Sequence, residues 1–138
     1  MRSIAWLVAL SVCIGVGAEP SVLERLQREL KVAAPPEHYP DHAEYRLFPK
    51  VCNKSTCFVV LAVQSPAFDG MAVHLAIFSE SEHYLGRYVG LQRMPTGVSG
   101  PVLHFSTTAP MDAIRFDRPS PPPEVRVAGR NHVFQRAR

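Results

Sequence analysis

The segment Phe58–Val63 limits the possible folds more than any other stretch of the chain, because every one of its residues is apolar. Successive side chains of a strand point to opposite faces of its sheet, so a strand here has two apolar faces. Both faces need cover, as in a central strand between two layers. The sequence therefore predicts a layered, β-rich domain with this segment at its centre.

Other segments alternate with the two-residue period of strands. In the next segment Val73, Leu75 and Ile77 share one face, and the residues between them share the other. Gly86 and Gly90 lie in a further strand-like segment, where they indicate a bulge or the close approach of another backbone. The remaining candidates, separated by turn-forming clusters, are 45–48, 84–91, 103–105, 114–116 and 125–127.

An amphipathic helix precedes these strands. Ser21 and Glu24 have the spacing of a capping box, and apolar residues follow at positions 22, 23, 26 and 30. Such a stripe packs on its own domain or docks on a partner, and the first is the simpler interpretation. We therefore predict a mainly β fold: a single small β-sandwich or partly open barrel of about seven strands, preceded by one short amphipathic N-terminal helix.

The first residues have the pattern of a secretory signal, with Arg2, the apolar run Ile4–Ile14 and small residues before Glu19. The run is shorter than the roughly 20 residues that cross a bilayer, so we expect a secreted or periplasmic protein with no transmembrane segment in the mature chain. A lipoprotein anchored at Cys13 is the alternative, disfavoured by Val12 where a smaller residue is usual. The predicted organisation is a signal peptide at 1–18, an amphipathic helix at 19–33, a Pro-rich connector at 34–42, the β-sandwich domain at 43–129 and a basic C-terminal tail at 130–138.

Cys52 and Cys57 are the cysteines left after removal of the signal peptide, and in an oxidising compartment we expect a disulfide between them. The bridge needs Cα atoms about 5.5 Å apart, so the chain between them must reverse. Asn53 and Ser55 favour a turn there, which predicts a stapled hairpin. The spacing is not that of a Cys-x-x-Cys redox site, whereas Asn53-Lys54-Ser55 matches a glycosylation sequon.

His38 and His42 form the most site-like pair of residues, since imidazoles are favoured ligands of zinc and copper. Metal binding would need a third ligand, such as His83 or His104. Pro40 lies between the pair and disfavours the helix that would align the two rings. Ordinary surface histidines are the simpler interpretation, and we assign no metal ligand and no cofactor from the sequence.

The segment Ser79–His83 contains hydroxyls, carboxylates and an imidazole, the groups used in general acid–base catalysis. It also has the composition of an exposed hairpin tip, which is the interpretation we favour. The stretch Gly97–Pro101 has only part of the Gly-x-Ser-x-Gly pattern and is predicted to be a turn. His74 and His104 lie in predicted strands, where a half-buried histidine usually bonds a neighbour and can titrate near neutral pH. No catalytic residue is assigned.

The C-terminal segment is basic, because from Glu124 onward that single acid faces arginines at 126, 130, 136 and 138. Such a segment suits an acidic partner or an anionic surface, although a frayed terminus is the simpler interpretation. Nucleic acid is not an expected partner, given the export signal and the absence of an interleaved aromatic and basic stripe. Pro119–Pro123, which precedes this segment, predicts a stiff polyproline spacer.

Together these features favour a small exported non-enzymatic binding protein, for example an inhibitor or immunity-type protein acting on a secreted or cell-wall-active enzyme. Its partner would then be another protein. One alternative is a periplasmic copper- or zinc-binding sandwich protein that uses His38 and His42. The other is a small secreted hydrolase whose serine, histidine and acidic residues meet only in the folded chain. The sequence leaves the partner's identity and the oligomeric state open.

Overall fold

The computed structural model describes residues 20–40, 42–106 and 112–138. The predicted signal peptide at 1–18, with Cys13, lies outside these ranges. The described helices are α2 (Val22–Ala33) and the 3-10 turns η1 (Pro36–His38) and η2 (Asp69–Met71). The described strands are β1 (Glu44–Leu47), β2 (Val51–Cys52), β3 (Cys57–Gln64), β4 (Val73–Ser79), β5 (Tyr84–Leu91), β6 (Pro95–Ser99), β7 (Val102–Phe105), β8 (Ala113–Arg115), β9 (Glu124–Val127), β10 (Arg130–Val133) and β11 (Gln135–Arg136).

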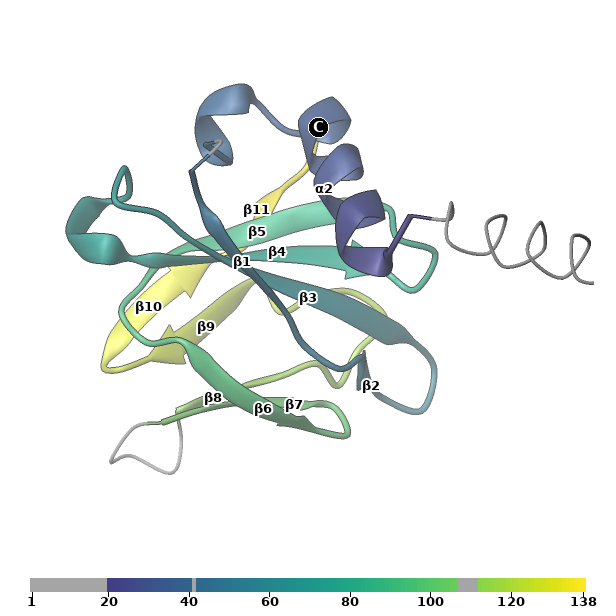
Figure 1. Cartoon of the computed structure of the whole chain (residues 1–138). Coiled ribbons are helices and arrows are strands. Elements are labelled where there is room, and N and C mark those ends of the chain that lie inside the picture. Colours follow the sequence, from purple (N-terminus) through teal and green to yellow (C-terminus); the bar gives the residue numbers. More distant parts are fainter. Residues whose placement is uncertain (1–19, 41, 107–111) are drawn as a thin grey trace, which may run out of the picture.

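The largest sheet is antiparallel and has the strand order β1-β3-β4-β5-β11, with β2 also pairing with β3. Strands β6, β7 and β8 form a second sheet, and β9 and β10 form a hairpin. Figure 1 shows these smaller sheets on one side of the large sheet and α2 on the other. The predicted mainly β sandwich with one short helix is confirmed. The structure has more strands than the about seven predicted. Two-residue strands such as β2 and β11 have no periodicity to detect. The predicted turn at Gly97–Pro101 is wrong for residues 97–99, which belong to β6 and whose small and turn-forming residues hide the strand.

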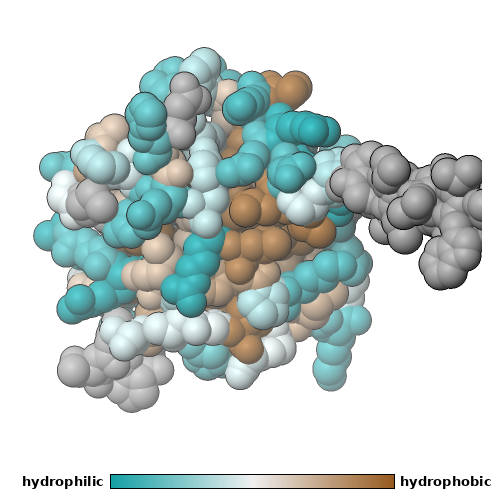
Figure 2. Space-filling model, viewed as in Figure 1, coloured by the Kyte–Doolittle hydropathy of each residue, from teal (hydrophilic) through white to brown (hydrophobic). Residues whose placement is uncertain are grey.

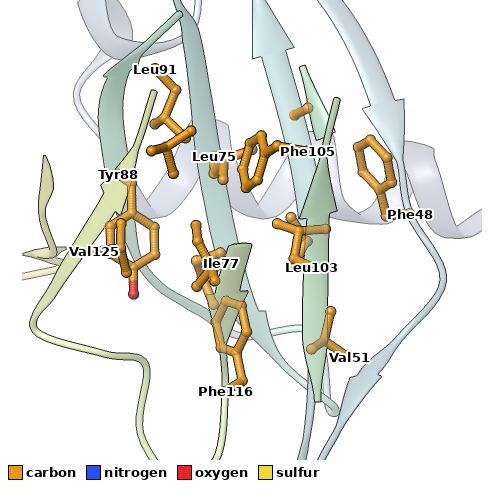
Figure 3. Close-up of a cluster of buried hydrophobic side chains, with 14 of the residues drawn as sticks. Phe48, Val51, Leu75, Ile77, Tyr88, Leu91, Leu103, Phe105, Phe116 and Val125 are labelled. Carbon is orange, nitrogen blue, oxygen red and sulfur yellow. The ribbon is translucent and has the colours of Figure 1, made fainter. Parts of the chain in front are cut away.

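Strand β3 lies between two hydrophobic cores, as its composition predicts. Val60 and Ala62 belong to the core between the sheets, whereas Val59, Leu61 and Val63 belong to the core beneath α2. Each of these five side chains is at most 4% exposed. Figure 3 shows the first core, where side chains of the large sheet face those of β7 and β9. The predicted division of β4 is also confirmed, with Val73, Leu75 and Ile77 in the first core and Ala76 and Phe78 in the second.

Helix α2 covers the second face of the large sheet. Ser21 caps its N-terminus, because the Ser21 Oγ accepts a hydrogen bond from the Glu24 amide at 3.2 Å. Leu26 and Leu30 are buried against the sheet. The apolar stripe therefore packs on its own domain, and its two central leucines are not available to a partner. Figure 2 shows that apolar surface also lies below α2, over β3.

The β2–β3 hairpin has the predicted disulfide between Cys52 and Cys57, whose Cα atoms lie 4.0 Å apart. Asn53 forms the turn, since its Oδ1 accepts hydrogen bonds from the amides of Ser55 and Thr56 at 2.8 and 2.9 Å. The stapled hairpin is therefore confirmed, and side-chain hydrogen bonds define its turn as well as the sulfur bridge.

Strand β5 is irregular at both of its glycines. The register with β4 shifts between Ile77 and Phe78, opposite Gly86, and again near Gly90. Gly86 has a φ of +146°, and a Cβ at this position would contact the Gln135 carbonyl oxygen and the ring of Phe134. The predicted close approach of another backbone is confirmed at Gly86, and that backbone is β11.

The segment 130–138, predicted as a basic tail outside the sandwich, is part of the sheets. β10 pairs with β9, and β11 is the edge strand of the large sheet. Ala128 and Gly129 have positive φ values of 52° and 76°, the backbone of a tight hairpin turn. Backbone pairing does not depend on side-chain charge, which explains why counting arginines did not reveal these strands.

The polyproline segment is also packed against the domain. Tyr88 is buried and its hydroxyl donates a hydrogen bond to the Pro122 carbonyl at 2.7 Å. The Phe134 amide donates to the Pro123 carbonyl at 2.8 Å. Both carbonyls therefore hold this segment against β5 and the C-terminal strands. Its composition predicts a stiff spacer, whereas the segment is packed on the domain.

Candidate functional site

The segment Ser79–His83 forms the turn between β4 and β5, as predicted. Its groups bind one another and α2. The Ser79 Oγ accepts a hydrogen bond from the His83 amide at 3.1 Å, and Arg25 donates to both carboxylate oxygens of Glu82 at 2.8 and 2.9 Å. The His83 Nδ1 lies 3.9 Å from the Glu29 Oε2, which is too long for a hydrogen bond. In the contacts among described residues, Ser79 therefore has no imidazole base.

The histidines considered as metal ligands are dispersed. His38 lies in η1 and is half-buried, whereas His42 is exposed. His83 lies at the β4–β5 turn. His104 lies on β7, which belongs to the other sheet, and it is exposed, whereas the sequence predicts a half-buried ring. Within residues 20–40, 42–106 and 112–138, no three His, Cys, Asp or Glu side chains are placed to hold a metal ion.

Two hollows adjoin β11, the edge strand of the large sheet. The first, about 410 Å³, is named here the proline hollow, and the second, about 640 Å³, the β11 hollow. The proline hollow is lined by Pro121, Pro122, Pro123 and Phe134 together with arginines. The β11 hollow lies between the end of α2, η1, β5 and β11, where Figure 1 marks the C-terminus.

Arginines from distant parts of the sequence line these hollows. We call them the arginine face, and they are Arg87, Arg115, Arg118, Arg136 and Arg138. Arg136 lines both hollows. The acidic residues lining the same hollows are Asp117, which pairs with Arg115 at 3.3 Å, and Glu37. The face therefore has a positive charge that its own carboxylates do not balance.

Arg87, on β5, differs from the other arginines of this face because it is half-buried, whereas they are exposed. Its Nε donates a hydrogen bond to the Gln135 Oε1 at 3.1 Å. Its Nη1 is buried and has no hydrogen-bond partner among the described residues. Besides the β11 hollow, Arg87 lines a third hollow of about 310 Å³, which also contains His74 and is named here the His74 hollow.

Tyr84 lines the β11 hollow together with Arg87, and its hydroxyl is hydrogen-bonded to that of Tyr39 at 2.8 Å. Burial is the main cause of the raised pKa of both phenols, and the charge of Arg87 partly opposes it. Both hydroxyls therefore stay protonated at physiological pH.

A scan against protein-family models finds no family that matches this chain, and no curated protein or solved structure matches it. None of the helices in the described residues is long and apolar enough to span a membrane.

The environment of His74 differs from the one predicted from the sequence. Its ring stacks on Phe68, with ring centroids 3.8 Å apart, and its Nδ1 is buried without a hydrogen-bond partner among the described residues. Burial, followed by the charges of Arg87 and His38, lowers the pKa of His74 from its ordinary 6.5 to about 4. His74 is therefore neutral at physiological pH, whereas the sequence predicts a bonded ring that titrates near neutrality.

This shift predicts a loss of stability in mild acid. As the pH falls from 6.5 toward 4, an unfolded His74 takes up a proton that the folded ring does not bind. The free energy of unfolding therefore falls by about 1 kcal/mol between pH 7.5 and pH 5, after allowing for partial exposure of the ring. Urea unfolding of the wild type and of His74→Phe at pH 7.5 and 5 measures the effect, and the variant should show the smaller loss. An equal loss in both proteins would contradict this assignment.

Sequence reasoning missed Arg87, Tyr39 and Tyr84. The one available signal was an arginine within a strand-like segment that also contains aromatic and glycine residues. Such a signal is weak, because arginines are common on the exposed face of strands. Only the folded positions of η1 and β11 show that Arg87 is partly covered.

Proposed function

We propose that this chain is an exported non-enzymatic protein that binds another protein, an inhibitor or immunity-type protein acting on a secreted or cell-wall-active enzyme. The arginine face is the observation that carries this proposal. A partner with an acidic cleft would be complementary to it in charge, which favours specific and fast association. Arginine is also among the residues most often found at the energetic centre of protein interfaces.

Two features support the compartment in this proposal. The apolar run at 4–14 has the pattern of a signal sequence, and the Cys52–Cys57 disulfide is of a kind that persists in oxidising compartments. Intact mass measurement of the exported chain is expected to show a start near Glu19 and no free thiols.

The test is reversal of charge on the arginine face. The triple variant Arg115→Glu, Arg118→Glu, Arg136→Glu is expected to bind its partner at least about tenfold more weakly than the wild type, because attraction becomes repulsion. The immobilised chain captures the partner from culture supernatant or periplasmic extract of its own host, and titration with the purified partner gives the affinity.

Arg93→Glu is the matched control, because Arg93 is an exposed arginine that lines neither hollow of the arginine face. It should bind the partner as the wild type does. Equal binding by the triple variant, or no protein retained by the wild type, would refute the proposal.

A further inference from the structure

Arg87 is a half-buried positive charge, and no ion pair with a carboxylate of the described residues is formed by its guanidinium. The ion pairs among described residues join Arg25 with Glu82, Lys50 with Glu80, His83 with Glu29 and Arg115 with Asp117, and none involves Arg87. A buried donor without a hydrogen bond is destabilising, and more so when it carries charge. A fold that retains such a group at a hollow has a strong donor available for a ligand.

The surroundings select an anionic ligand. In the β11 hollow, Arg136, Arg138 and His38 lie around Arg87, with Glu37 as the acid. In the His74 hollow, Arg130 and Asp69 are the other charged groups, and His74 is neutral. Among the residues that line the two hollows, Arg87 and three other arginines therefore face two carboxylates.

The geometry favours a carboxylate in particular. The hydrogen bond from Nε to Gln135 positions the guanidinium, and its buried Nη1 has no hydrogen-bond partner among the described residues. A guanidinium edge matches the two oxygens of a carboxylate. The Tyr39 and Tyr84 hydroxyls share a single hydrogen bond, so the accepting hydroxyl retains its own proton for donation near the same place.

We propose that Arg87 is the centre of a carboxylate-binding site, which takes up an acidic side chain or the terminal carboxylate of the partner. This inference rests on the proposed function in one respect, because that function supplies the partner whose carboxylate binds here. Binding of a free carboxylate at Arg87 does not depend on the proposed function. The guanidinium forms the ion pair, Gln135 positions it, and the tyrosine pair adds a neutral donor.

NMR titration of the disulfide-bonded chain tests the site. The probes are acetate and a capped diglutamate peptide, and the signals are the Arg87 Nε–H and the ring of His74. Saturable shifts are expected in the wild type, with affinity at least about tenfold weaker in Arg87→Gln and unchanged in Arg93→Gln. Arg87→Lys keeps the charge without the planar fork, so its affinity should lie between those of the wild type and Arg87→Gln. The His74 pKa should rise on saturation, because the bound carboxylate offsets the charge of Arg87.

The outcomes separate this site from the proposed function. Shifts that do not saturate, or that persist in Arg87→Gln, would overturn the carboxylate site even if a partner is captured through Arg115, Arg118 and Arg136. Saturable binding at Arg87 without any captured partner would support the site and overturn the proposed function. Binding of acetate but not of the peptide would assign the site to a small free acid and overturn its role in partner recognition.

Discussion

Replacing Gly86 by alanine is expected to lower the free energy of unfolding by about 3 kcal/mol or more. The φ of +146° is a conformation that residues with a side chain rarely adopt, and the added methyl group would overlap the Gln135 carbonyl and the Phe134 ring. β11 must then move away from β5. Urea unfolding measures the loss, and hydrogen exchange of the Ala137 amide, which bonds the Leu85 carbonyl, reports on β11.

Gly97→Ala is the control for this change, because its φ is not in the positive range and no atom lies within 4 Å of the added Cβ. Its stability should be close to that of the wild type. A loss below about 1 kcal/mol in Gly86→Ala, with the Ala137 amide still protected, would show that β11 does not need this glycine. The result also bears on function, since β11 supplies Gln135 and Arg136 to the β11 hollow.

Asn53→Ala is expected to cost about 2–3 kcal/mol, because the side chain makes four hydrogen bonds of which each is worth about 1 kcal/mol or less. Besides its two bonds within the turn, its Nδ2 donates to the carbonyls of Phe116 and Arg118 at 2.7 and 2.9 Å. It therefore joins the stapled hairpin to the chain that follows β8. Thermal and urea unfolding of the disulfide-intact variant measure the cost.

Two further variants separate the roles of this side chain. Asn53→Asp keeps the acceptor for the turn but replaces the donor by an oxygen that faces two carbonyls. It should therefore lose at least the stability that the bonds to Phe116 and Arg118 contribute. Lys54→Ala, at an exposed position of the same turn, should change little. A stable Asn53→Asp would contradict this role. A glycan on Nδ2 would displace one of the same bonds, so we expect the sequon to be unmodified in the folded chain.

Much of the fold was predictable because it depends on local pattern. The apolar composition of 58–63 requires cover on both faces, and the two-residue alternation of Val73, Leu75 and Ile77 assigns one face of β4 correctly. The hairpin was predictable from Cys52, Asn53 and Cys57, since the turn and the bridge involve residues close in sequence.

The C-terminal strands were not predictable in this way. β11 has two residues, and its place beside β5 depends on the absence of a side chain at Gly86, about fifty positions earlier. The polyproline segment is similar, because its carbonyls meet Tyr88 and Phe134 only in the folded chain.

The candidate site depended even more on the tertiary structure. Sequence reasoning noted the C-terminal arginines, with an acidic partner or an anionic surface as options and a frayed terminus as the simpler interpretation, and Arg136 and Arg138 line the β11 hollow. It could not predict that Arg87 from the middle of the chain joins them, because charges act through space and not through sequence separation.

By itself, the sequence determined the strands that have a clear apolar or alternating pattern, which of their faces are apolar and which cysteines form the staple, since propensity and periodicity act between neighbouring residues. Only the tertiary structure decided that the end of α2 and η1 meet β5 and the edge strand β11 around one hollow and leave Arg87 half-enclosed. Long-range packing brings those elements together, and no local pattern encodes it.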